Sequence, residues 1–230
     1  MDEGRITTTQ EINKTLKQQL HDFKTVRIEG LLHQHCIAVG IGKGVKIITN
    51  GNAGDLFASL NNGAKIVLNG GAGRFVGDSM TEGEIHINGN VGNGAGTYIS
   101  GGILIVKGNA GGKVGQYMKN GIVVIEGNAG DFIGLHQAGG TIVVTGDVGD
   151  MASHWKAGGD IYIGGNHGEI GYNGEEAPLE SEDKDFLQSL FKKYDIDSEI
   201  KEFKKITATN PKLDYTKKHK TENVVLPRGE

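Results

Sequence analysis

The chain has one cysteine, three prolines and one tryptophan among its 230 residues. A single thiol, Cys36, cannot form an intramolecular disulfide and fits a reducing compartment, so we expect a cytoplasmic protein. So little proline argues against a collagen-like or low-complexity chain. No apolar run approaches the ~18 residues of a membrane span. The net charge of −4 does not indicate the positively charged surface that binds nucleic acid. We therefore expect neither a membrane nor a nucleic-acid partner.

Glycine, in contrast, is abundant, with 39 residues, far above its usual ~7% share. It recurs every 19 residues at Gly51, Gly70, Gly89, Gly108, Gly127, Gly146 and Gly165. Each of these residues opens a phrase such as GNAG or GDVG, and a short run rich in Ile and Val closes the unit. A fixed period of this length indicates a solenoid of stacked repeats.

The repeat unit favours strands over helices. Each helical glycine costs about 1 kcal/mol relative to alanine, whereas the alternating Ile and Val runs are typical of strands. Coils made of short strands and tight turns stack about 4.8 Å apart. We predict an all-β core that forms a right-handed parallel β-helix, with α-helices flanking both ends. Six full coils span residues 51–164, with a degenerate coil before them and a fading one after.

Equivalent positions in each coil are expected to have the same role. Strand pairs such as Ile66/Leu68 point inward, as does the column that starts at Phe57. Asparagines that follow the opening glycines, from Asn52 to Asn166, are predicted to form a side-chain amide ladder. The structural turn glycines of the central coils are Gly70, Gly73, Gly77, Gly89, Gly92, Gly96, Gly108, Gly111, Gly115, Gly127, Gly130 and Gly134.

Open solenoid ends expose strand edges and need caps. We divide the chain into an N-terminal helical cap (1–24), the β-helix (25–174) and an acidic helical C-terminal tail (175–230). In the first part, Thr8 and Glu11 are spaced as a capping box. The residues predicted for its buried helical face are Ile12, Leu16, Leu20 and Phe23.

In the C-terminal tail, Ser181 is expected to N-cap a second helix. Its apolar stripe is predicted to be Phe186, Leu187, Leu190 and Phe191. A third short segment follows at 198–206, and we expect the helices of this tail to plug or flank the solenoid. The final stretch, 216–230, is predicted to be a mobile arm or a partner-dependent tail.

Two short motifs carry alternative chemistry. GIGKG at 40–44 resembles a phosphate-binding loop in its glycines and lysine. Such a loop continues with Ser or Thr and leads into a helix, whereas Val45 follows here and no helix start is expected next to it. The favoured interpretation is that these glycines form a turn. His33, His35 and Cys36 contain metal-ligand atoms, but a zinc site normally takes three or four ligands. Alternation along a strand would also point His35 and Cys36 to opposite faces. Packing and surface roles are therefore favoured.

Two columns of side chains along the stack also suggest binding. Asp131 and Asp150 lie one coil apart, close to the ~5 Å carboxyl separation of retaining glycosidases, although turn aspartates commonly accept backbone hydrogen bonds. Tyr98, Tyr117, His136 and Trp155 occupy one position of four consecutive coils, either as a ligand platform or as a simple stack between coils.

The most suggestive feature is a stripe at outward positions of the closing strands. These positions are polar or mixed in the early coils, such as Lys65/Val67, and then become apolar. The stripe comprises Ile103, Ile105, Ile122, Val124, Val143 and Tyr162. Contiguous apolar patches mark interfaces, so we expect a partner or one of the chain's own helices to cover this face.

The repeated G-xx-G-xxx-G phrase, continued by Met80 and Met118, resembles the GXGXG β-helix family. That family includes the C-terminal domain of the glutamate synthase large subunit, which some organisms make as a separate protein. It also includes the formylmethanofuran dehydrogenase subunit that is built from the same repeats. The resemblance covers about residues 25–172. The helix before the repeats and the acidic helical tail after them make the chain more similar to the separate glutamate synthase domain.

The resemblance implies a non-catalytic scaffold or interface subunit of an oxidoreductase complex. Its expected partners are a glutamine amidotransferase subunit and an FMN/iron–sulfur synthase subunit. FMN and the iron–sulfur clusters would then reside in those partners, and none in this chain, whose one cysteine cannot supply a cysteine cluster. The alternatives are a formylmethanofuran dehydrogenase component, an independent carbohydrate-acting β-helix protein, or a homo-oligomer formed through the stripe.

Overall fold

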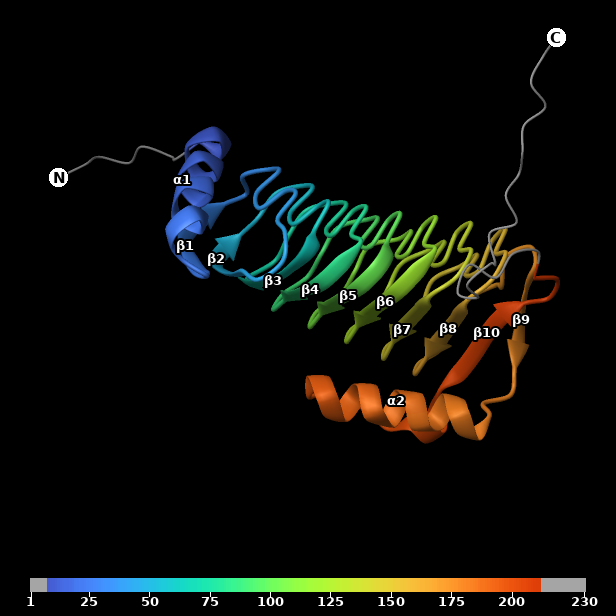
Figure 1. Cartoon of the computed structure of the whole chain (residues 1–230). Coiled ribbons are helices and arrows are strands. Elements are labelled where there is room, and N and C mark those ends of the chain that lie inside the picture. Colours follow the sequence, from blue (N-terminus) through green and yellow to red (C-terminus); the bar gives the residue numbers. More distant parts are fainter. Residues whose placement is uncertain (1–7, 212–230) are drawn as a thin grey trace, which may run out of the picture.

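The structure is a computed structural model that describes residues 8–211 (Figure 1). Two α-helices accompany the strands in this part of the chain, and none of its helices is long and apolar enough to cross a membrane. The elements, in order, are α1 (Thr9–Asp22), β1 (Thr25–Leu32), β2 (Lys46–Asn52), β3 (Asn62–Asn69), β4 (Glu82–Ile87), β5 (Ser100–Val106), β6 (Asn120–Ile125), β7 (Thr141–Val144), β8 (Asp160–Ile163), β9 (Gly174–Ala177), α2 (Ser181–Tyr194), a 3-10 turn (Ile200–Glu202) and β10 (Lys204–Ala208).

Strands β1 to β8 pair in parallel, each with the next along the chain. The register advances by one repeat at every step, so that Ile66 pairs with Ile85 and Ile85 with Leu104. The chain therefore winds into a parallel β-solenoid of about seven turns with 19-residue spacing. The predicted fold class is confirmed.

The core of the solenoid is the set of inward columns that the sequence predicts. Ile66, Leu68 and the equivalent residues of later coils are fully buried, and so is the column that starts at Phe57. The small residues between the opening glycines form a second, minimal ladder of single bridges, from Ala72 through Val91 and Ala110 to Val148. Backbone pairing thus joins each coil to the next at two places, in the strands and at the opening glycines.

Side-chain oxygens at the turn positions form a polar ladder between coils. Oδ1 of Asn90 accepts the backbone N–H of Asn109 at 2.8 Å, and Oδ1 of Asn109 accepts that of Asn128 at 2.8 Å. Asn128 and Asp147 continue the series. The ladder thus joins side chain to backbone, and the predicted amide-to-amide pairing at these positions is wrong. Backbone N–H groups at an open corner need an acceptor, and the side chain of the previous coil provides it.

The N-terminal helix begins as predicted. Thr8 is its N-cap and forms a full capping box with Glu11. Ile12 and Leu16 are buried against the end of the core. Asn13 binds the carbonyl of Cys36 at 2.8 Å and the N–H of Ala38 at 3.2 Å, which anchors α1 to the first coil. Phe23 follows the helix as its C-cap and is 61% exposed, so its predicted place on the buried face is wrong.

The C-terminal end contains two strands that the sequence analysis did not predict. Strand β10 pairs antiparallel with β8, and β9 pairs with β10, so that both extend the main sheet. The segment 198–206 is therefore a 3-10 turn followed by a strand. Its lysine-rich sequence is a weak strand signal, but the open edge of β8 offers it hydrogen-bond partners. The predicted arm at 216–230 lies outside the described residues.

Candidate functional site

Helix α2 covers the apolar stripe. Five stripe residues are buried in one cluster with Leu187, Leu190 and Phe191 of the helix; they are Ile103, Ile105, Val124, Val143 and Tyr162. Ile122 is partly buried against the same cluster. Of the two coverings that the sequence leaves open, the structure therefore shows the chain's own helix, which lies across β5 to β8 (Figure 1).

The helix starts at Ser181, with Glu180 rather than Ser181 as the N-cap residue. Glu180 and Asp183 form the capping box, in which Oδ2 of Asp183 accepts the N–H of Glu180 at 3.0 Å. The helix ends at Tyr194, and the φ of 55° at its C-cap residue Asp195 lies in the left-handed region. Nζ of Lys107, on the solenoid, donates to the carbonyl of Asp195 at 3.0 Å. A lysine at this end also suits the negative pole of the helix dipole.

A buried polar cluster holds the first turn of α2. Tyr162 donates to Asp183 at 2.6 Å, and Nζ of Lys205 contacts both oxygens of Asp183 at 2.8 and 3.1 Å. Burial opposes ionisation of Asp183, but the hydrogen bonds from Lys205 and Tyr162 outweigh it and lower its pKa. Burial and the bond to this carboxylate raise the pKa of Tyr162, which keeps its hydroxyl a donor.

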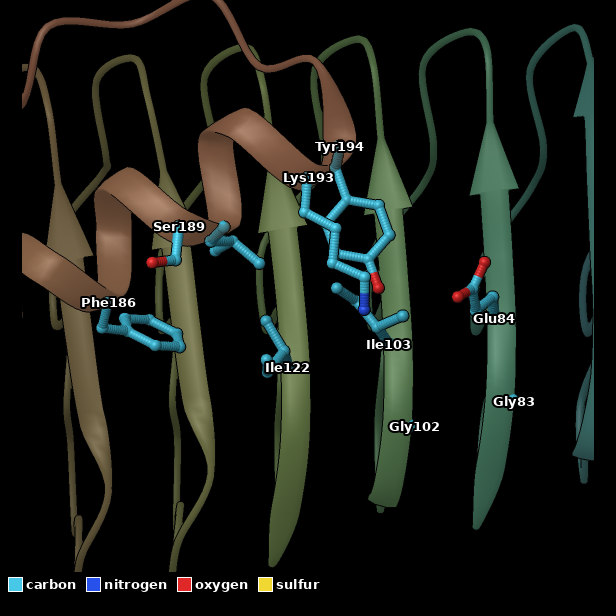
Figure 2. Close-up of a pocket in the computed structure, with 10 residues that line it drawn as sticks. Gly83, Glu84, Gly102, Ile103, Ile122, Phe186, Ser189, Lys193 and Tyr194 are labelled. Atoms are coloured by element: carbon cyan, nitrogen blue, oxygen red, sulfur yellow. The ribbon is translucent and has the colours of Figure 1, made fainter.

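Beside the C-terminal half of α2, a groove of about 500 Å³ opens between the helix and strands β4 to β6 (Figure 2). Two stripe residues, Ile103 and Ile122, line its floor. Phe186, Ser189, Leu190, Lys193 and Tyr194 project into it from the helix. The groove is therefore the part of the stripe that the helix leaves accessible.

The rim of the groove is charged. Oε2 of Glu84 accepts from Lys65 at 2.8 Å, and Nε2 of His86 lies 3.3 Å from it. The hydrogen bond from Lys65 is the main cause that lowers the pKa of Glu84, while burial lowers the pKa of His86. Nζ of Lys193 lies 4.9 Å from the centre of the Tyr194 ring. An occupant would meet an apolar floor with both signs of charge at its edges.

The twelve predicted turn glycines all lie in the tight parts of the coils, where two constraints operate. At Gly77, Gly96, Gly115 and Gly134 the φ angle is 65° to 71°, and an added Cβ would meet inward side chains of a following strand. At Gly130 a Cβ would lie 2.8 Å from the backbone nitrogen of Gly112 in the preceding coil. These glycines allow the coils to approach each other.

The remaining candidate residues are placed in structural settings. Oδ1 of Asp131 accepts the N–H of Asp150 at 2.9 Å, and Asp150 does the same for Glu169 at 3.0 Å, so both carboxylates are engaged in turn bonds. The GIGKG segment leads into strand β2 and not into a helix. Tyr98, Tyr117 and His136 stack with centroids 4.9 and 5.0 Å apart.

The HQHC segment is a turn, not the strand on which the opposite-face prediction for His35 and Cys36 rested. Nδ1 of His35 accepts the N–H of Asp55 at 2.9 Å, which joins this turn to the next coil. Within residues 8–211, no group of three or more His, Cys, Asp or Glu side chains is arranged to hold a metal ion.

Comparison with known families agrees with this architecture. A family described as the GXGXG motif matches residues 4–224. The chain belongs to the GXGXG family. This is the family of the glutamate synthase C-terminal domain. A comparison with curated proteins returns no match. The GXGXG match extends beyond the glycine phrases and includes both α1 and α2, so the flanking helices belong to the same family unit as the coils.

Proposed function

We propose that this GXGXG protein is a non-catalytic scaffold subunit of a glutamate-synthase-type oxidoreductase, which holds a glutamine amidotransferase subunit and an FMN/iron–sulfur synthase subunit together. The observation that carries the proposal is the solenoid itself, in which the candidate acids Asp131 and Asp150 are engaged in coil-to-coil bonds. Membership of the family of the glutamate synthase C-terminal domain supports the choice of complex.

The sequence supports placing the cofactors in the partners. An iron–sulfur cluster takes several cysteine thiolates, and the whole chain has only Cys36. A carbohydrate-cleaving role receives less support, because a general acid or base needs a carboxylate free to meet the substrate. Asp131 and Asp150 each use Oδ1 to accept a backbone N–H of the next coil, which gives both a structural role in the turn.

Within this function, we place a partner contact at the groove beside α2. The groove continues the apolar stripe that already forms the α2 interface, and Ile103 and Ile122 are shared by both. Its opposite charges, Glu84 and Lys193, suit a protein segment with an apolar side chain flanked by polar groups. Ser189→Trp would fill the groove from the helix side, whereas Gln188→Trp, on the exposed side of α2, is the matched control.

The experiment is affinity purification of the tagged chain from its native host, followed by mass spectrometry and reconstitution. The proposal expects an amidotransferase and an FMN/iron–sulfur protein, and a loss of glutamine-dependent but not ammonia-dependent glutamate formation when the chain is left out. Ser189→Trp should weaken recovery of one partner, and Gln188→Trp should not. Recovery of molybdenum or tungsten subunits would favour the formylmethanofuran dehydrogenase alternative, and a chain recovered alone would contradict the scaffold role.

A further inference from the structure

One edge of the solenoid has an unusual backbone. At two positions of each coil from residue 56 to 155 the backbone is left-handed, and at all but one of these positions the residue is not glycine and has φ between 54° and 60°. The first column contains Leu56, Phe75, Lys113, Phe132 and Met151, and the second contains Leu60, Ser79, Tyr98, Tyr117, His136 and Trp155. We call these eleven residues the αL edge. Glycine, asparagine and aspartate are the residues that this backbone region favours, and Gly94 is a glycine in the first column.

Core packing does not explain the large side chains of the αL edge. Leu60, Tyr98 and Trp155 are 54%, 49% and 54% exposed, and the other members are exposed or half-buried. Asparagine or glycine at these positions would relieve the backbone and leave the core unchanged. Large apolar residues that are both conformationally unfavourable and exposed indicate a surface that contacts another molecule.

Neither helix covers this edge. Helix α2 packs on the outward face of the strands, and α1 packs on the end of the solenoid at the first coil (Figure 1). The exposed aromatic series continues at Tyr172, which is 64% exposed and whose ring centre lies 4.5 Å from that of Trp155. The apolar surface thus runs along the axis over successive coils.

The orientation of the rings excludes a sugar platform along most of this surface. Tyr98, Tyr117 and His136 are nearly parallel, with interplanar angles of 8° and 2°, so that the inner faces lie against one another. A sugar stacks on a ring face, whereas this ladder presents ring edges and hydroxyl groups. A row of edges is flat and suits the surface of a protein, in which Tyr, Trp and Met are common contact residues.

We propose that two copies of the chain associate through the αL edge in a two-fold dimer. Five of the eleven residues are Phe, Tyr or Trp, each of which can bury about 150–250 Å². Leu60, Tyr98 and Trp155 are about half exposed, so the edge can contribute several hundred Å² toward the ~800 Å² per partner of a stable interface. A straight edge that repeats along the axis is self-complementary, as a two-fold interface requires. Lys113 is the only Lys, Arg, Asp or Glu among its eleven residues, so that self-association brings few like charges together.

The charges beside the edge favour an antiparallel arrangement. The neighbouring column has an ion pair between Asp55 and Arg74, 2.8 Å apart, in the early coils and has Asp131, Asp150 and Glu169 in the late coils. A two-fold axis that reverses the coil order keeps the acidic rows of the two copies apart. It places each acidic row near the Asp55–Arg74 end of the other copy, where the charges are already paired, and so avoids the repulsion between like charges.

The experiment is sedimentation or light scattering of the purified full chain over a wide range of concentrations. The parent should have twice its mass of 24.4 kDa. Tyr117→Asn combined with Trp155→Asn removes two rings but introduces a residue that the αL region favours. We expect this variant to remain folded and to dimerise about 100-fold more weakly.

A retained fold together with a weakened dimer separates an interface from a structural stack. Val67→Asn, on the strand face, is the control and should leave the dimer intact. A parent that remains monomeric at its highest attainable concentration would overturn the proposal, and so would a double variant that dimerises as strongly as the parent. A double variant that unfolds would also overturn it, because the rings would then be structural.

Discussion

The hydroxyl of Tyr162 donates to Oδ1 of Asp183 at 2.6 Å, and this bond joins the last parallel strand of the solenoid to the first turn of α2. The same carboxylate accepts from Lys205 of β10 and from the N–H of Glu180. One buried side chain thus connects three elements. Helix α2 is therefore held by a specific polar contact in addition to its apolar face.

Removing the hydroxyl in Tyr162→Phe should weaken this connection. A hydrogen bond to a charged group contributes about 1.5–3 kcal/mol, so we expect the free energy of unfolding to fall by that amount in urea denaturation at neutral pH. Tyr98→Phe is the control, because Tyr98 is 49% exposed and its ring stacks on Tyr117. Equal losses of unfolding free energy in the two variants would show that the hydrogen bond from Tyr162 does not stabilise the fold.

Asp183 should also make the stability depend on pH. Its pKa is lowered in the folded protein, so its contribution is present above the unfolded value of about 3.9 and is lost as the pH falls through the folded value. Asp183→Asn removes the charge and should destabilise the chain at neutral pH. The difference between parent and variant should shrink under acid conditions. A difference that stays constant with pH would contradict the ionised state of Asp183.

Val124→Lys tests the packing of α2 on the stripe. Val124 is fully buried, and an unpaired lysine there would cost about 3–5 kcal/mol or displace the helix. Val67 occupies the same outward column but is only partly buried, so Val67→Lys is the matched control and should cost less than about 1 kcal/mol. Thermal unfolding and proteolysis of α2 measure both, and equal behaviour would refute the role of the stripe.

The coils were predictable because every coil repeats the same constraints. An inward position such as Ile85 has equivalents one repeat away on either side, and a one-residue shift would expose all of them at once. The capping box of Thr8 and Glu11 is local and was equally readable. A structural feature that recurs in every repeat, or that depends on residues within one helical turn, can be predicted from a single sequence.

The helix that covers the stripe, the strand at the open end of the sheet and the αL edge were less predictable. The alternation of Ile103 and Ile105 showed an apolar outward face, but the contact with Leu187 depends on the path of the chain after Ala177. Strand β10 forms because β8 has an open edge, and Lys204 and Lys205 gave no local sign of it. The αL edge was missed because its usual marker is glycine or asparagine, and Tyr117 or Trp155 contains no such signal.

Gly115→Ala should separate two reasons for glycine in the turns. Its φ is 65°, and an added Cβ would enter the space of the Ile142 side chain. We expect a loss of about 2–4 kcal/mol from strain and overpacking together. Gly44→Ala has a φ of 80° but meets nothing within 4 Å, so it should cost only the conformational part, about 1–2 kcal/mol. Equal losses in urea denaturation would mean that crowding by Ile142 is unimportant.

Lys156 is a lysine in the core of the solenoid. It is 1% exposed and occupies the column of Met80, Ile99 and Met118, and its Nζ donates to Oε1 of Gln137 at 2.7 Å. Burial lowers its pKa to about 7, against a partial opposing effect of Asp160. Since an unfolded lysine titrates near 10.4, the unfolded chain binds more protons between these two values. Stability should therefore rise from about pH 7 to about pH 10.

Lys156→Met should remove this rise, because methionine does not titrate and already fills the equivalent sites in two other coils. At pH 7 two effects oppose each other. Relief of the buried amine stabilises the variant, while Oε1 of Gln137 loses its donor at a cost of about 1–3 kcal/mol. The measurement is urea denaturation at several pH values, with exposed Lys119→Met as the control that should retain the parent's slope. A Lys156→Met variant with the parent's slope would show that another group is responsible.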